Sequence, residues 1–187
     1  MERLDIYDEK RRRLGYSLPR GVRRRAGEYT LFVGIFTVNR EGELLLTRRA
    51  PEKKEWPLAW ENTAGAVLTD EDTRTAAVRE LYEETGITVP ADTLILLGTE
   101  RSKSAIGDAF LSFVSERPPI TLQAGETVDY RWVSLDDLPQ LMEQGALAPP
   151  VTRRLGVLYP LILRHYEARR AGIPSDETTV PPIFTSV

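Results

Sequence analysis

The segment "GAVLTDEDTRTAAVRELYEETGI" spans residues 65–87 and holds four glutamates and two aspartates. Within it, Glu80, Glu83 and Glu84 lie three and four residues apart, so a helix would bring them to one face. Like charges at this spacing repel and cost stability unless a cation neutralises them. Arg79, four residues before Glu83, supplies part of that charge, and a divalent metal ion would supply more.

The same stretch predicts a helix over residues 70–85. Thr69 or Asp70 can cap its start, and Gly86 can end it in the left-handed conformation. Three apolar side chains, spaced three and four residues apart, give the helix one apolar face: Val78, Leu81 and Tyr82.

A metal held by these carboxylates would have a definite chemistry. Mg²⁺ prefers oxygen ligands in an octahedron, and a bound phosphate can complete its shell. The metal would polarise a phosphoryl oxygen and acidify an attacking water, and a free glutamate could take the proton. The alternative is a solvated acidic face, which is common on surface helices and which helical spacing alone favours.

The full spacing reverses that preference. Glycine, five residues, glutamate, seven residues, then Arg-Glu-aliphatic-x-Glu-Glu-x-Gly-aliphatic is the signature of the Nudix hydrolases, and this stretch resembles it at every fixed position. Seven fixed residue types of roughly 7% usage each would meet by chance in about 10⁻⁸ of windows. The matching residues are Gly65, Glu71, Arg79, Glu80, Leu81, Glu83, Glu84, Gly86 and Ile87.

The resemblance implies an α/β fold in which a mixed β-sheet lies between helices, with the signature forming a strand, a loop and a helix. It implies cleavage of a small-molecule diphosphate by a pyrophosphatase that uses Mg²⁺ or Mn²⁺. It assigns metal binding to Glu80, Glu83 and Glu84, with Glu71 and Gly65 beside them. Catalytic roles fall on Glu80, Arg79 and Glu83.

Within these catalytic roles, Arg79 would orient the glutamates and Glu80 would act as the base. The family does not use one base throughout, so acids outside the signature are further candidates. Glu126 and Asp108 are the two in this chain, and each is otherwise an ordinary surface acid.

Upstream of the signature, "NREGELLLTRRAPEKKEWPLAWENTAGA", residues 39–66, resembles type 1 isopentenyl-diphosphate isomerases, which share the Nudix fold. By that resemblance Arg49 and Lys53 contact the diphosphate, whereas Arg48 points to the other sheet face. Trp56, like Trp60, could stack on a base or cover apolar substrate, or simply pack the loop.

The departures from the isomerases indicate a hydrolase. Ala64 stands where they have a catalytic cysteine, and Ala66 and about Thr30 stand where they have metal-binding histidines. The one histidine, His165, lies in a predicted C-terminal helix. A non-catalytic ligand-binding Nudix domain and an isomerase remain the alternatives, and residues 45–51 match a coenzyme A motif only in part.

The chain of 187 residues suits one domain. We divide it into an N-terminal hairpin and basic segment (1–28), a core (29–170) and a Pro-rich tail (171–187), which is either disordered or laid on a partner subunit. We expect a hairpin over residues 29–50 with its turn at 39–42, and further core strands in residues 93–102, 108–116 and 127–135. A short capped helix is expected near 134–145, and a longer helix over 150–170. Pro160 should kink or break this longer helix.

Composition narrows the functional classes. The chain has no cysteine, which excludes disulfides, zinc–thiolate sites and cysteine nucleophiles. A net charge of −3 gives no reason to expect nucleic-acid binding. The longest apolar run, residues 31–38, is too short for a membrane span, and no signal peptide is evident. We expect a cytoplasmic enzyme, with a homodimer left open.

Overall fold

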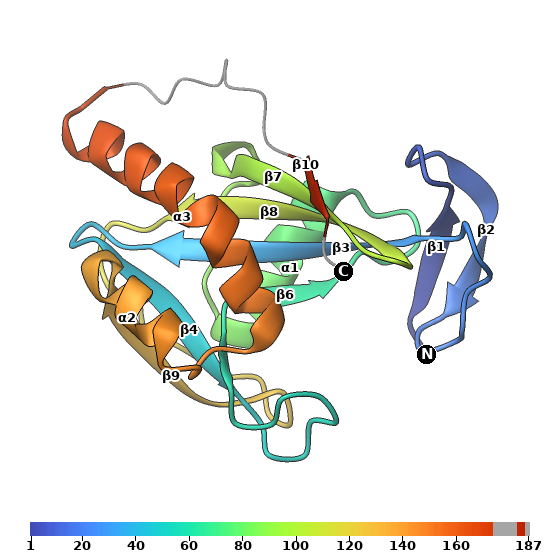
Figure 1. Ribbon diagram of the computed structural model, residues 1–187, viewed down its shortest axis with the longest axis horizontal. Coiled ribbons are helices and arrows are strands. Elements are labelled where there is room, and N and C mark those ends of the chain that lie inside the picture. Colours follow the sequence, from blue (N-terminus) through green and yellow to red (C-terminus); the bar gives the residue numbers. More distant parts are fainter. Residues whose placement is uncertain (174–182, 186–187) are drawn as a thin grey trace.

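A computed structural model describes residues 1–173 and 183–185. Its centre is a mixed sheet in which the long strand β3 pairs parallel with β8 and antiparallel with β4 and β6 (Figure 1). The strands of this sheet are β3 (Thr30–Val38), β4 (Glu43–Arg49), β5 (Trp60–Glu61), β6 (Thr63–Ala66), β7 (Ile95–Arg101), β8 (Ala105–Phe113), β9 (Thr127–Ser134) and β10 (Ile183–Thr185).

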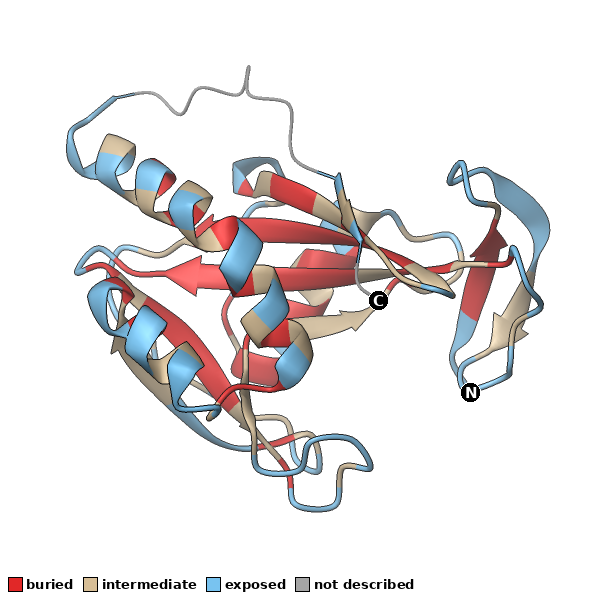
Figure 2. Cartoon of the chain, viewed as in Figure 1, coloured by how far each residue is buried: buried red, intermediate tan, exposed pale blue. Residues whose placement is uncertain are grey.

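Helices cover both faces of the sheet, as predicted. Successive residues of a strand point to opposite faces, so Ile35 packs in the cluster around α1 (Thr73–Thr85), while Phe36 packs in the other cluster. That second cluster includes α2 (Leu138–Glu143) and α3 (Pro149–Arg170), which lie in front of the sheet in Figure 1. Buried residues concentrate in the central strands (Figure 2).

The N-terminal hairpin is also present. Strands β1 (Arg3–Tyr7) and β2 (Arg13–Pro19) form a separate antiparallel pair that lies beside the main sheet in Figure 1. Backbone hydrogen bonds between Tyr7 and Tyr29, both 2.8 Å, tie it to the start of β3. The outer side of the hairpin is largely exposed (Figure 2).

Helix α1 starts later than predicted. Its cap is Asp72, whose side chain accepts a hydrogen bond of 2.8 Å from the Thr75 amide, so the prediction of Thr69 or Asp70 was wrong. Asp70 has a positive φ of 64°, and its amide donates to Asp5 of the hairpin, which holds the preceding loop out of the helix. Gly86 ends the helix with φ 76°, as predicted.

The C-terminal helix α3 runs through Pro160 without the predicted break. Proline cannot donate to the carbonyl four residues earlier, which belongs to Gly156. Both Gly156 and Pro160 are exposed, so water can serve that carbonyl. None of the described helices is long and apolar enough to cross a membrane.

The other predicted elements agree with the structure in type. A 3₁₀ turn (Leu135–Asp137) leads into the short helix α2, and a second one (Ala91–Thr93) precedes β7. The expectation that the tail is disordered or laid on a partner subunit was wrong for residues 183–185, which form the edge strand β10 parallel to β7 of the same chain. Residues 174–182 and 186–187 lie outside the described residues. Strand β6 is the strand that the signature implied, whereas the two-residue strand β5 was not predicted.

The buried His165 of α3 predicts a pH dependence of stability. Burial, followed by the charge of Arg164, lowers its pKa below the ordinary 6.5. At pH values just below 6.5, His165 is therefore protonated more often in the unfolded chain than in the folded one. The free energy of unfolding should fall as the pH drops through this range. Urea unfolding measured at about pH 7.5 and 5.5 should show that the free energy of unfolding falls more for the wild type than for His165→Gln. Equal falls in the two proteins would contradict this role of His165.

Candidate active site

Arg79 organises the acidic face of α1. Its guanidinium donates to both oxygens of Glu71 (2.9 and 2.8 Å), to Glu80 (2.8 Å) and to Glu83 (3.2 Å). It also donates to the backbone oxygen of Ala66 (2.9 Å), which ties α1 to the end of β6. These carboxylates raise the pKa of Arg79, and the hydrogen bonds that Arg79 donates to Glu71 are the largest cause.

The loop between β6 and α1 fixes Glu71. The amide of Leu68 donates to its carboxylate at 3.0 Å. Burial pushes the pKa of Glu71 upward, but the hydrogen bonds from Arg79 and Leu68 outweigh it and leave the pKa lowered. Glu71 is therefore held as an anion beside Arg79.

Gly65 lets Glu80 approach the sheet. Strand β6 pairs with β3 so that Gly65 lies opposite Val33, on the side covered by α1. A Cβ atom at Gly65 would lie 1.9 Å from Cδ of Glu80, which no real structure tolerates. Only glycine allows the Glu80 carboxylate to rest against the backbone of this strand.

Glu84 is the most unusual group in the site. Its side chain is 8% exposed, and its Oε2 atom is buried without a hydrogen-bond partner among the described residues. Burial raises its pKa well above the ordinary value, and the charges of Glu61, Glu80 and Glu126 raise it further. The backbone amide of Ala64 opposes this rise, but no cation that the structure describes balances the charge, and a buried charge without a counterion costs on the order of several kcal/mol, so this position calls for a cation.

Glu61 is a member of this acidic group that sequence reasoning missed. It lies on β5 opposite Thr47, on the same sheet face as Arg49, which donates to both of its oxygens (2.8 and 2.7 Å). Burial raises the pKa of Glu61, and Arg49 opposes the shift. Glu61 joins the acidic group only through the pairing of the two-residue strand β5 with β4. Its position in the sequence has no defined spacing from the signature, so the sequence did not indicate it.

The predicted phosphate-binding residues face the same acidic group. Arg49 is held by Glu61 and by the backbone oxygen of Glu55 (3.0 Å), and Lys53 forms an ion pair with Glu126. Arg48 instead donates to the Leu58 backbone (3.0 Å) and lies 5.8 Å from the ring centre of Trp60. Arg49 and Arg48 therefore make separate sets of contacts.

The two tryptophans of the loop differ in their surroundings. Trp56 is 41% exposed and has a positive φ of 45°. Trp60 is half-buried on β5, with the guanidinium of Arg131 4.1 Å from its ring centre. The exposed Trp56 is thus available to a ligand, whereas Trp60 packs against two arginines.

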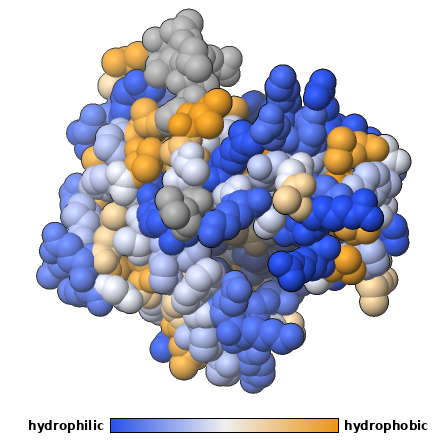
Figure 3. All heavy atoms as spheres, turned by 45° about the vertical axis from the view of Figure 1, so that its right-hand side comes forward, coloured by the Kyte–Doolittle hydropathy of each residue, from blue (hydrophilic) through white to orange (hydrophobic). Residues whose placement is uncertain are grey.

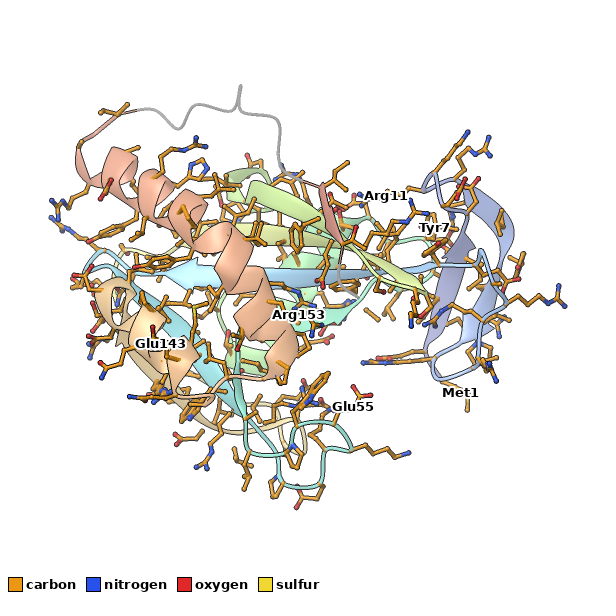
Figure 4. All side chains as sticks on the ribbon, in the orientation of Figure 1. Met1, Tyr7, Arg11, Glu55, Glu143 and Arg153 are labelled. Atoms are coloured by element: carbon orange, nitrogen blue, oxygen red, sulfur yellow. The ribbon has the colours of Figure 1, made fainter. Side chains whose placement is uncertain are left out.

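Asp108 is not brought to the glutamates. It is 4% exposed and accepts hydrogen bonds from Arg11 (2.9 Å), from Thr73 at the start of α1 (2.7 Å) and from Thr99 of β7 (3.0 Å). Arg11 and Tyr7 lie together where the hairpin meets the main sheet (Figure 4). Asp108 fastens the hairpin to the core, and its bound oxygens leave no position for a water.

The donor atoms suit a hard cation. All candidate ligands are carboxylate or backbone oxygens, which Mg²⁺ and Mn²⁺ prefer. Across the described residues, no three acidic or histidine side chains lie close enough to hold a metal as they stand. Arg79 occupies oxygens of three of these acids, but the unpaired Oε2 of Glu84 remains, and it fits a metal ligand.

Comparison with known proteins decides the family. The NUDIX domain model matches residues 28–155, which is more than half of the chain. The chain belongs to the Nudix family. An uncharacterised Nudix hydrolase of Listeria innocua is 31% identical to this Nudix protein over 80% of the chain and 89% of its own length. The protein is accordingly a Nudix-type diphosphate hydrolase in its enzyme class.

Two further similarities agree with this Nudix assignment. An isopentenyl-diphosphate Delta-isomerase of Clavibacter sepedonicus is 30% identical over 75% of the chain and 76% of its own length, as the resemblance upstream of the signature predicted. The crystal structure of DR0079 from Deinococcus radiodurans, 23% identical, superposes with a TM-score of 0.66 and covers 87% of this chain and 98% of that one. The latter shows the shared fold alone.

Proposed function

We propose that this Nudix protein hydrolyses the diphosphate linkage of a small organic diphosphate, such as a nucleoside-diphosphate derivative, with Mg²⁺ or Mn²⁺. The observation that carries the proposal is the buried carboxylate of Glu84, whose Oε2 has no hydrogen-bond partner among the described residues and whose pKa the charges of Glu61 and Glu80 raise, in a signature that keeps every acid. A ligand-binding domain without catalysis would have no use for such a costly group.

Glu80, Glu83 and Glu84, with the backbone oxygen of Gly65 and with Glu71 nearby, would hold the metal. When bound, Mg²⁺ or Mn²⁺ would polarise a phosphoryl oxygen and lower the pKa of a water. The water oxygen forms a bond to phosphorus while the bond to the bridging oxygen breaks, and the leaving phosphate keeps that electron pair.

Proton transfer and orientation fall to residues of the signature. Glu80 takes the proton of the attacking water, because its carboxylate rests against the β6 backbone and burial raises its pKa toward that task. Glu126 is the second candidate base, since it lies close enough for its charge to act on Glu84. Arg79 orients Glu71, Glu80 and Glu83 through its four hydrogen bonds to their carboxylates.

Arg49 and Lys53 would hold the substrate's phosphates. Both are paired with acids, Glu61 and Glu126, and a diphosphate can take over these cations while the metal takes over the acids. The exposed Trp56 would cover the rest of the molecule. The surface that carries the hairpin is mostly hydrophilic around a hollow (Figure 3), which suits a charged ligand.

Arg49 and its neighbour Arg48 provide a matched test of this binding mode. Arg49→Ala should raise KM about tenfold or more, since an arginine–phosphate contact is a charge-assisted hydrogen bond. It should also lower kcat if the phosphorus moves out of line. Arg48→Ala removes the same charge from a side chain that contacts the Leu58 backbone and Trp60 instead of the acidic group. It should change KM less than about threefold. If both variants change KM and kcat equally and only slightly, Arg49 serves only to form the ion pair with Glu61.

Isomerase activity is the second candidate, because a relative of this name shares 30% identity. Isomerisation must add a proton to one carbon and remove a different proton from another carbon. Alanine at positions 64 and 66 offers neither a proton donor nor a metal ligand. We expect no interconversion of isopentenyl and dimethylallyl diphosphate by the metal-loaded protein, measured by product analysis after long incubation. Turnover that Glu84→Gln abolishes would overturn the hydrolase assignment.

The experiment that tests the function is a substrate screen with Mg²⁺ and with Mn²⁺. It should include nucleoside di- and triphosphates, dinucleotides, nucleotide sugars, coenzyme A and prenyl diphosphates. We expect phosphate-containing products from at least one of them. Our proposal further treats residues 1–187 as one cytoplasmic domain acting on a small molecule rather than on nucleic acid or a membrane, with a homodimer left open.

A further inference from the structure

A cavity lies away from the signature, at the C-terminal ends of the parallel strands β3 and β8. Its volume is about 530 Å³, within the range of small-molecule sites. Val33, beside Gly65, lies five residues before Val38 on β3, so the cavity is roughly 16 Å along the strand from the signature. The lining includes Asn39, Arg40, Phe113, Tyr166, Arg169 and Arg170.

The cavity is walled by elements that are far apart in the sequence. Figure 1 shows the C-terminal half of α3 passing the end of β3, where the turn to β4 begins. Tyr166 of α3 donates a hydrogen bond to the backbone oxygen of Arg40 at 3.3 Å. Its ring lies so close to Gly42 that a Cβ there would be 2.7 Å from Cζ, so the glycine admits the ring. Tyr166 thereby fixes the turn that carries Arg40.

The charge of the cavity is unbalanced. Arg40, Arg169 and Arg170 line it, no acid does, and none of the three forms an ion pair with any residue that the structure describes. The turn also carries two acids: Glu41, which follows Arg40 in the chain but does not line the cavity, and Glu43, which is already engaged by Asn39 and Arg117, each at 2.7 Å. Cations at a helix C-terminus also favour the helix dipole, but Arg40 comes from another element and has no such reason to converge.

Aromatic rings complete the cavity. Phe113, half-buried at the end of β8, has the guanidinium of Arg169 4.8 Å from its ring centre, and Tyr166 lies on the opposite element. Arginines bind phosphate oxygens in a bidentate manner, whereas aromatic rings and stacked guanidinium groups accept the face of a heterocyclic base. We propose that this cavity binds a nucleotide, with its phosphate on Arg40 and Arg169 and its base against Phe113 and Tyr166.

The test is calorimetric titration of the full chain with AMP in EDTA, which keeps metal away from the signature. The double variant Arg40→Ala, Arg169→Ala should raise the Kd for AMP about tenfold or more, because two charge-assisted contacts are lost. Arg164→Ala removes the same charge from an exposed position of the same helix, outside the cavity, and should leave Kd unchanged. Arg169→Lys, which keeps the charge but not the fork, should lie between.

Each other outcome overturns the proposal. If the wild type does not bind AMP at millimolar concentration, the cavity is not a nucleotide site. If the double variant and Arg164→Ala lose affinity for AMP equally, the binding reflects only the net positive charge of this region. A loss confined to Arg49→Ala places the binding in the active site instead. Inorganic phosphate or adenosine binding as tightly as AMP would contradict the assignment of a nucleotide. The exposed positions of Arg40 and Arg169 leave folding intact, which unchanged melting temperatures would verify.

Discussion

Replacing Glu84 by glutamine should lower kcat by about 10²-fold or more, while the fold stays intact or becomes more stable. The substitution keeps the size of the side chain and removes its charge from the centre of the acidic group. Because Oε2 of Glu84 is buried without a hydrogen-bond partner in the described part of the chain, its replacement removes a destabilising charge from the metal-free protein rather than a contact. Activity and stability should therefore move in opposite directions.

The pH dependence of the metal-free protein separates this effect from ordinary damage. The pKa of Glu84 is raised in the folded state, chiefly by burial, so the folded chain binds more protons above the ordinary glutamate pKa. The free energy of unfolding should then fall as the pH rises through that window, and Glu84→Gln should lose this slope. Glu167→Gln, an exposed acid on α3, is the control and should match the wild type. A kcat within threefold of the wild type would contradict the role of Glu84.

The substitution Gly65→Ala should be nearly as damaging to turnover, by about 10²-fold, although it adds one methyl group. The new Cβ would lie 1.9 Å from Cδ of Glu80, so the carboxylate must leave the β6 backbone or the strand must shift. Either movement displaces the proposed base and a metal ligand together. We expect kcat to fall far more than KM rises, measured by steady-state kinetics on the best substrate.

Gly156→Ala is the matched control for this change. Gly156 is exposed in the middle of α3, and a Cβ there meets nothing within 4 Å. Alanine should leave turnover unchanged and stabilise the helix by about 0.5–1 kcal/mol. Comparable activities for the two alanine variants would show that Glu80 does not need its close approach to β6.

The fold was predictable to the extent that local patterns specify it. The signature implied the strand, loop and helix around Gly65, apolar segments marked the long strands, and Gly86 ends α1 in the left-handed conformation as predicted. Strand β5 has only two residues, Trp60 and Glu61, which are too few for a periodic pattern. The cap of α1 moved to Asp72 because the loop before it docks on the hairpin, a tertiary contact that capping preferences do not encode.

The site was predictable where its residues share one helix, and less so where distant segments meet. Spacing alone placed the three glutamates and Arg79 together. Glu61 reaches the same group only through the pairing of β5 with β4, and Asp108 is engaged by Arg11 of a hairpin 97 residues earlier. Neither of these two tertiary contacts produces a pattern in the local sequence. For this reason the sequence indicated Asp108 as a candidate base and did not indicate Glu61.

The most direct measurement follows oxygen from labelled water through the reaction. The best substrate of the screen is incubated in H₂¹⁸O with Mg²⁺, with Mn²⁺, and after EDTA treatment, and the products are analysed by mass spectrometry. Water attack on phosphorus at the glutamates predicts ¹⁸O in a phosphate group of one product, no product in EDTA, and recovery when metal is restored. Equal turnover in EDTA, or label only in a non-phosphate product, would contradict metal-dependent cleavage of a diphosphate by this protein.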